Sequence, residues 1–220
     1  MEQFDREHQP DIDRLRAQQP APDAAALIAA AAPPPSSWNW AFYQPFVALA
    51  LQHGLPIVAA NVSRRDARSV MQAGLASHGF TAAVPAEVDA GITNAVLQSH
   101  CGQIDAPTAG RMALAQVARD QFMARLVEAH AERGVLLLAG NGHVRTDTGV
   151  PRWLRAGIRT RTEAIGMLEA GDEPGAAFDR VVVTAAQQRA DPCAARSAAR
   201  ATTATSAGRN GRTASPPWSS

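Results

Sequence analysis

The sequence predicts an α/β fold in which a mostly parallel β-sheet is flanked by helices, with a small helical subdomain. Short apolar runs alternate with segments of helical pattern, and this alternation is typical of βαβ units. The two clearest runs, at residues 55–62 and 135–139, are almost continuously apolar, as expected for strands covered on both faces. Ligands of open parallel sheets bind at the carboxyl ends of the strands, which is where Asn61 and His143 lie.

Helices are predicted where helix-favouring residues are followed by a stop signal. Residues 24–32 are rich in alanine, which favours helix, and the prolines at 33–35 cannot continue it. Glycines at positions 54, 74 and 134 are typical of helix C-termini. The predicted helices cover residues 10–32, 47–53, 64–73 and 107–132, and a short helix begins at Pro151. Further strands are predicted at residues 158–168 and 179–184, whereas residues 77–107 carry mixed signals of short helices and loops.

The composition predicts one folded domain followed by a tail. The chain of 220 residues is long enough for a single sizeable core. After about residue 189, alanine, arginine, serine, threonine and glycine dominate, and such a composition buries too little apolar surface to offset the entropy of ordering. We therefore predict a domain over residues 1–193 and a disordered low-complexity tail over residues 194–220. A frameshifted coding end would have the same composition.

Several classes of protein are not favoured by the sequence. The net charge is +1, so no strong field attracts nucleic acid, and no nucleic-acid partner is expected. Cys101 and Cys193 lack the spacing of a redox or zinc site, and a single pair so far apart does not make a disulfide scaffold. The common nucleophile-elbow, zinc-protease and phosphate-loop motifs are missing from the sequence.

An ordered set of short motifs resembles the ChaN-like haem-binding uptake family, which is related to the Tiki, TraB and erythromycin-esterase-like proteins. The resemblance runs from residue 1 to about residue 193. The motifs are Trp38-Asn39-Trp40 with Tyr43-Gln44-Pro45, Ala59-Ala60-Asn61 with Arg64, His100-Cys101-Gly102, Ala115-Gln116 with Arg119-Asp120, Gly140-Asn141-Gly142-His143-Val144-Arg145 and Gly149-Val150-Pro151.

The resemblance implies a role in bacterial iron and haem uptake, with haem bound through a tyrosine at a dimer interface. It also implies an envelope-associated lipoprotein, with an outer-membrane haem receptor as a candidate partner, although residues 1–16 are polar and show no signal-peptide pattern. Family members usually begin with a strand that ends in a Gly-Glu-x-His-type motif. Residues 1–4 match the end of the family's second strand, so we expect the first strand to be absent, through a misassigned start or a true truncation. The chain has no lysine, so arginine must replace any lysine contact to a haem propionate.

Tyr43, the only tyrosine, is the candidate ligand of the haem iron. Tyrosinate is an established haem-iron ligand, and Trp40 is a neighbouring aromatic residue that could pack against a porphyrin face. The alternative is that the aromatic segment 38–46 is simply a hydrophobic plug of the helical subdomain, since aromatic clusters more often form core.

His143, Arg145 and Asn61 are the other candidate cofactor-binding residues. His143 follows glycine, which allows close backbone approach at a strand end, and could bind a metal or a propionate; it could equally fix the loop. Arg145 is predicted to pair with Glu2, and Asn61 anchors either a loop or an anionic group. At helical spacing, Gln116, Arg119, Asp120 and Met123 form one stripe.

Haem binding without catalysis is the leading hypothesis, and no catalytic residue is assigned. The alternative is a metal-dependent hydrolase related to the Tiki and erythromycin-esterase-like proteins, using Glu2 and His143. That chemistry requires a further histidine or carboxylate. A third alternative is an inactive fragment.

Overall fold

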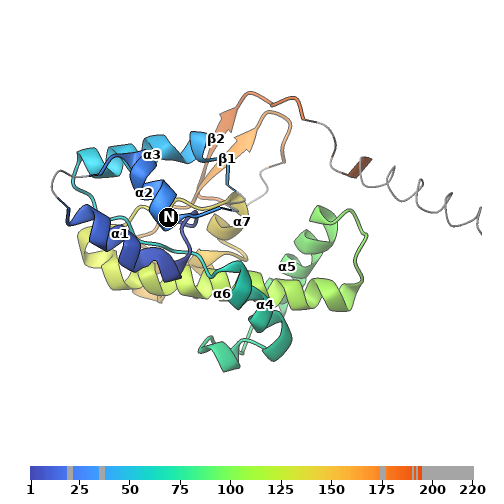
Figure 1. Ribbon diagram of the computed structural model, residues 1–220. Coiled ribbons are helices and arrows are strands. Elements are labelled where there is room, and N and C mark those ends of the chain that lie inside the picture. Colours follow the sequence, from blue (N-terminus) through green and yellow to red (C-terminus); the bar gives the residue numbers. More distant parts are fainter. Residues whose placement is uncertain (19–21, 35–37, 174–176, 190, 192, 195–220) are drawn as a thin grey trace, which may run out of the picture.

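A computed structural model of the chain describes residues 1–18, 22–34, 38–173, 177–189, 191 and 193–194, and most of them are helical (Figure 1). The predicted tail at 194–220 lies almost wholly outside the described residues. No helix of the described part is both long and apolar enough to cross a lipid bilayer. The α-helices are α1 (Gln9–Arg16), α2 (Ala24–Ala31), α3 (Trp40–Gln52), α4 (Arg64–Ala73), α5 (Ala86–Ser99), α6 (Ala106–His130), α7 (Asn141–Val144) and α8 (Ala156–Arg159). Short 3₁₀ helices are η1 (Arg6–His8), η2 (Ala76–His78), η3 (Ala131–Arg133) and η4 (Val150–Trp153), and the strands are β1 (Ile165–Glu169) and β2 (Arg180–Thr184).

Helix α6 runs along the molecule and packs against α4 and α5 (Figure 1). It begins where the Asp105 carboxylate accepts a hydrogen bond from the Thr108 amide (2.8 Å), with Pro107 in the first turn. Small residues of α6, among them Ala109 and Ala113, lie fully buried against apolar side chains of α4 and α5. Because small side chains let helices approach closely, α6 can serve as the scaffold of this end of the molecule.

The N-terminal helices α1, α2 and α3 form a second apolar cluster. Phe4, Ile12, Leu27 and Val47 are fully buried together there. Helix α2 is capped by the Asp23 side chain and α3 by that of Asn39. The predicted helix at residues 10–32 is in fact two helices, since α1 ends at Arg16 and α2 begins at Ala24, just after Pro22, which cannot continue a helix.

The predicted α/β fold with a mostly parallel β-sheet is wrong. The described residues contain one two-stranded sheet, β1 and β2, which pair in parallel from Ile165 with Arg180 to Glu169 with Thr184. Residues 55–62 and 135–139, expected as buried strands, form neither helix nor strand apart from the isolated bridge at Asn61. Apolar runs indicate burial, whereas a strand requires a ladder of hydrogen bonds. Leu136 is in fact 88% exposed.

Other predictions from local pattern are confirmed. Helix α4 has the predicted bounds and ends at Gly74, whose φ is 82°. Helix α3 reaches Gln52 and is followed by Gly54 at φ 63°, and the last strand agrees with β2. Helix α5 lies where only mixed signals were found.

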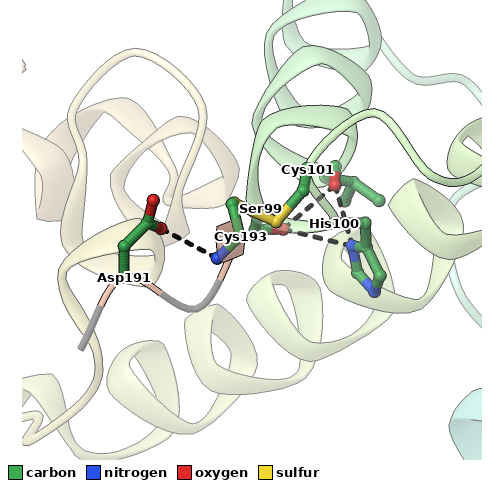
Figure 2. Close-up of a disulfide and its surroundings, with 6 residues drawn as sticks. Ser99, His100, Cys101, Asp191 and Cys193 are labelled. Atoms are coloured by element: carbon green, nitrogen blue, oxygen red, sulfur yellow. Dashed lines mark hydrogen bonds between the residues drawn. A yellow bond between two sulfur atoms is a disulfide. The ribbon is translucent and has the colours of Figure 1, made fainter. Parts of the chain in front are cut away.

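Cys101 and Cys193 form a disulfide, with a Cα–Cα distance of 5.5 Å (Figure 2). Their spacing in the sequence, 92 residues, gave no indication of this pairing. Cys101 lies in the turn after α5, and the Cys193 amide donates to the Asp191 carboxylate (2.8 Å). The disulfide therefore ties the end of the described chain to the α5–α6 turn.

Candidate functional site

A polar cavity of about 420 Å³ lies among the N-terminal residues, the end of α2, the start of α4 and α6. Its volume falls within the range of small-molecule binding sites. The ionisable side chains of its wall are Glu2, Asp5, His8, Arg64, Arg119 and His143. The remaining wall includes the amide residues Gln3, Asn61 and Gln116, together with Trp38.

The segment at residues 1–5 brings this wall together. The Glu2 amide donates to the Leu138 carbonyl (3.0 Å) on one side. On the other side, the Asn61 amide donates to the Phe4 carbonyl (3.0 Å), and Asp5 and Asn61 form an isolated parallel bridge. Residues 1–5 therefore lie between the ends of the two apolar segments, so Asn61 and His143 face one cavity although the predicted sheet is absent.

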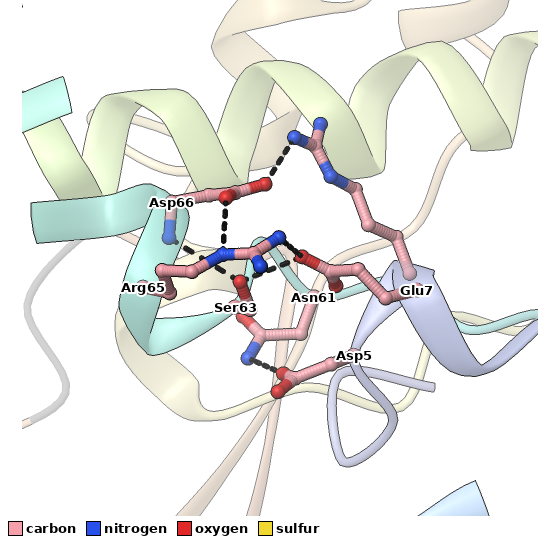
Figure 3. A network of polar contacts seen from close by, with 7 residues as sticks. Asp5, Glu7, Asn61, Ser63, Arg65 and Asp66 are labelled. Atoms are coloured by element: carbon pink, nitrogen blue, oxygen red, sulfur yellow. Dashed lines mark hydrogen bonds and ion pairs between the residues drawn. The ribbon is translucent and has the colours of Figure 1, made fainter. Parts of the chain in front are cut away.

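A network of charged and polar contacts fixes residues 5–7 against the start of α4 (Figure 3). Asn61 Nδ2 donates to the Asp5 carboxylate (2.7 Å), and Ser63 Oγ donates to that of Glu7 (2.7 Å). Ser63 also caps α4, accepting from the Asp66 amide (3.3 Å). The network thus orients one side of the cavity.

Three ionisable residues meet at the other side of the cavity. His143 Nδ1 lies 2.6 Å from Asp120 Oδ1, and His143 Nε2 lies 3.4 Å from Glu2 Oε1. The second Glu2 oxygen accepts from the Gly140 amide (2.7 Å). Since each ring nitrogen faces a carboxylate, the arrangement favours a doubly protonated imidazolium.

Burial and charge shift the pKa values of this group. Burial raises the pKa of Asp120 to about 6, against the lowering effect of its hydrogen bond with His143. Burial alone would lower the pKa of His143, but the hydrogen bond with Asp120 and the charges of Asp120 and Glu2 outweigh it and raise that pKa. His143 is therefore held cationic further into the neutral range than an exposed histidine.

A tight loop presents His143. A side chain at position 149 would place its Cβ 2.4 Å from the His143 carbonyl oxygen, so only glycine fits there. Arg145 does not line the cavity. The prediction that it pairs with Glu2 is wrong, because its guanidinium donates to the Asp147 carboxylate (2.6 and 2.9 Å).

Tyr43 lies beside the cavity, in an aromatic cluster. Its ring centroid is 5.3 Å from that of Trp38, which lines the cavity, and 6.2 Å from that of Trp40. Trp40 in turn lies 5.0 Å from the buried Phe4. Burial, and then the charge of Glu2, raise the pKa of the Tyr43 hydroxyl. The structure thus brings Tyr43 and Trp40 together, and Trp38, which is part of the cavity wall, contacts Tyr43.

Three polar cavity residues, Gln3, Asp5 and His8, were missed in the sequence. Gln3 stands next to Glu2 in a buried segment, and its polar side chain was the signal that could have identified it as a cavity residue. His8 contacts the Asp11 carboxylate (3.2 Å), a pairing that their three-residue separation could have suggested. The stripe of Gln116, Arg119 and Asp120 does face this region: Arg119 donates to Asn61 Oδ1 (3.1 Å) and to Gln116 Oε1 (3.2 Å). The described residues contain no group of three or more side chains arranged to hold a metal ion.

A family model described as haem-binding uptake, Tiki superfamily, ChaN matches residues 1–154. The chain belongs to this family. The matched range contains every residue of the cavity wall and Tyr43, whereas β1 and β2 lie after it. The predicted resemblance to ChaN-like proteins is therefore confirmed.

Among solved structures, the chain is similar to one described as cofacial heme binding to ChaN of Campylobacter jejuni. The two are 21% identical with a TM-score of 0.63, over 82% of this chain and 70% of that one. At this identity the likeness is one of fold. No curated protein sequence matches the chain.

Proposed function

We propose that this member of the ChaN family binds haem in bacterial iron and haem uptake, with the phenolate oxygen of Tyr43 as the iron ligand. The supporting observation is the place of the only tyrosine in the chain, half-buried in an aromatic cluster beside a polar cavity. The description of the family is haem-binding uptake, and that of the similar C. jejuni structure is cofacial heme binding to ChaN.

The side chains around Tyr43 suit this ligand. The Tyr43 hydroxyl makes no hydrogen bond with another described residue, so its oxygen is available. Ferric haem supplies a Lewis-acidic iron that binds a phenolate. Burial and the charge of Glu2 keep the free Tyr43 protonated at neutral pH, so binding of iron must be coupled to release of the phenol proton. Trp40 offers a ring to one face of the macrocycle.

Asn61 and His143 are assigned a supporting role in this proposal. Asn61 donates to Asp5 and accepts from Arg119, and both nitrogens of His143 face carboxylates. These contacts hold the cavity wall beside the aromatic cluster. Arg145, engaged by Asp147, has the least support of the predicted cofactor-binding residues.

A second copy of the chain is the proposed cover of the haem face. Helix α3 exposes an apolar stripe of Phe42 (70% exposed), Phe46 (47%) and Leu49 (51%), on the helix that carries Tyr43. Exposed apolar residues at this spacing are typical of helix interfaces. An outer-membrane receptor as a further partner stays a prediction.

An equilibrium titration with ferric haem tests the proposal. Wild type should bind haem saturably, and Tyr43→Phe, which keeps the ring and removes the oxygen, should weaken binding by at least about tenfold, equivalent to about 1.4 kcal/mol. His53→Gln, at an exposed histidine that ends the same helix, controls for adventitious ligation and should bind as wild type. Absence of saturable binding, or equal affinity in Tyr43→Phe, would contradict the assignment.

A further inference from the structure

The first two residues pair on both sides, as residues of a central strand do. The Met1 ammonium donates to the Val58 carbonyl (2.7 Å), and the Met1 carbonyl accepts from the Ala60 amide (3.0 Å). On the opposite side, the Glu2 amide donates to the Leu138 carbonyl (3.0 Å). These are the contacts of a parallel ladder. Since residues 1–2 contact both neighbours, the space between the two flanking segments is one strand wide.

The ladder stops at Met1, but both flanking segments continue past it. In a strand, the amide and carbonyl of one residue face the same side, and the next residue faces the other side. The amide of Val58 and the carbonyl of Pro56 therefore face the space ahead of Met1, and the backbone groups of Leu136 and the amide of Leu138 face it from the other wall. These groups make no hydrogen bond with any described residue. We call the space between residues 56–58 and 136–138 the slot.

Neighbouring backbone edges that face away from the slot are covered by side-chain amides. Gln9 Nε2 donates to the Ile57 carbonyl (3.1 Å), and Gln9 Oε1 accepts from the Ala59 amide (2.6 Å). Asn141 covers β1 in the same way, since it donates to the Met167 carbonyl (2.5 Å) and accepts from the Met167 amide (3.1 Å). Uncovered edges tend to pair with another strand. The walls of the slot lack such cover in the described chain, and the group that fits both walls is a polypeptide backbone.

Large apolar side chains are exposed along these walls. Leu136 is 88% exposed and Val135 is 44% exposed on one wall, and Leu55 is 52% exposed next to the other. Exposed apolar residues that lie together are typical of interaction sites. A strand in the slot would cover part of this surface, so its own side chains should be apolar.

We propose that the slot binds an apolar β-strand at the carboxyl terminus of a partner polypeptide, parallel to both walls. The direction follows from the ladder that residues 1–2 form, and a strand that runs this way ends at Met1. The Met1 ammonium lies there with the Val58 carbonyl as its hydrogen-bond partner, and a terminal carboxylate complements its charge. Burial lowers the pKa of this ammonium to about 6, and a neighbouring carboxylate would favour its charged form. In strand addition of this kind, backbone hydrogen bonds supply the affinity.

Fluorescence anisotropy with a labelled peptide tests the proposal on the full chain at pH 6. The probe is Lys-Lys-Thr-Val-Leu-Val-Val with fluorescein at its amino end and a free carboxyl terminus. We expect saturable binding, and about tenfold weaker binding of the same peptide with an amidated carboxyl terminus, because it lacks the charge that pairs with Met1. A peptide with proline in place of the leucine should not bind, since proline removes a backbone donor.

N-methylated peptides distinguish the slot from a single open edge without any change to the protein. Between two walls, the amides of consecutive residues donate to opposite walls. N-methylation of the leucine, or of the valine that follows it, should therefore each weaken binding by at least about tenfold. Sensitivity at only one of these two positions would contradict a strand held on both sides.

Two matched variants locate the site on the protein. Leu136→Pro removes an amide that faces the slot, at a side chain that is almost fully exposed, and should weaken binding by about tenfold. Val135→Pro is the control, because the Val135 amide faces away from the slot. Circular dichroism checks that both variants are folded, and the N-methylated peptides decide the question if either is not.

Absence of saturable binding, equal binding of the proline peptide, or equal loss of affinity in Leu136→Pro and Val135→Pro would overturn the proposal. A dimer of the chain that the peptide dissociates in sedimentation would assign the slot to a second copy and would also overturn it. Tyr43→Phe should bind the peptide as wild type does, because the slot does not include Tyr43. Loss of peptide binding with haem binding intact would contradict this inference alone, and the reverse result would contradict the proposed function alone.

Discussion

Removal of the Asp120 carboxylate should destabilise the chain strongly. The Asp120 side chain is 3% exposed and lies 2.6 Å from His143 Nδ1, whereas the other carboxylate near this ring, that of Glu2, is 3.4 Å away. Asp120→Ala would leave a buried imidazolium with one more distant partner. Breaking a buried ion pair in this way typically costs about 3–5 kcal/mol, and we expect a loss of unfolding free energy in that range at pH 7.

Urea denaturation followed by tryptophan fluorescence measures this loss. Asp147→Ala is the matched control, because Asp147 also lies 2.6 Å from a cationic partner, Arg145, but its side chain is 49% exposed. An exposed pair contributes about 0–1 kcal/mol. The reasoning is refuted if the two variants lose equal amounts of free energy, since burial would then not determine the strength of the Asp120–His143 interaction.

Three further predictions concern protonation, the disulfide and the tail. The ring protons of His143, followed by NMR, should titrate with a midpoint above 6.5, and Asp120→Asn should lower that midpoint; a midpoint at or below 6.5 in wild type would contradict the assignment. Because the folded-state pKa is raised, the contribution of His143 to stability is fully present below the unfolded-state pKa and is lost as pH rises through the folded-state value. Reduction of the Cys101–Cys193 disulfide should lower the unfolding free energy by up to about 4–5 kcal/mol, from the entropy of opening a loop of this length; an unchanged urea midpoint in dithiothreitol would argue against a linked native state. Truncation after residue 194 should leave the urea midpoint unchanged, since the removed sequence lacks a core-forming pattern, and a clear shift would show that the tail contributes to folding.

Helices were predictable where the local signal was complete. The bounds of α4 followed from its stop at Gly74. For α3 only the end before Gly54 was predicted, since the helix begins at Trp40 and not at Val47. The sheet was not predictable in the same way, because residues 55–60 and 134–140 are apolar but have no regular ladder of hydrogen bonds in the described chain. The apolar character of a segment does not show whether another segment lies beside it to form the hydrogen bonds of a sheet.

The candidate site was predictable in its residue types more than in its contacts. Asn61 and His143 were expected at the ends of two apolar segments, and both face the cavity. The partner of Arg145 was mispredicted, since its guanidinium donates to the carboxylate of Asp147, only two residues away, and not to Glu2. Gln3 carried only the weak signal of a polar residue in an apolar context, and that it lines the cavity depends on how the N-terminal residues pack against α6 and Asn61.

The identity of the iron ligand is the central claim of the proposed function, and the visible spectrum of the ferric haem complex tests it most directly. With Tyr43 as ligand, wild type should show a high-spin spectrum with a phenolate-to-iron charge-transfer band. Tyr43→Phe removes the only phenol oxygen of the chain while preserving the ring, so the band should disappear and the far-ultraviolet circular dichroism should not change. An unchanged band in Tyr43→Phe, or its absence from wild type saturated with haem, would contradict the claim.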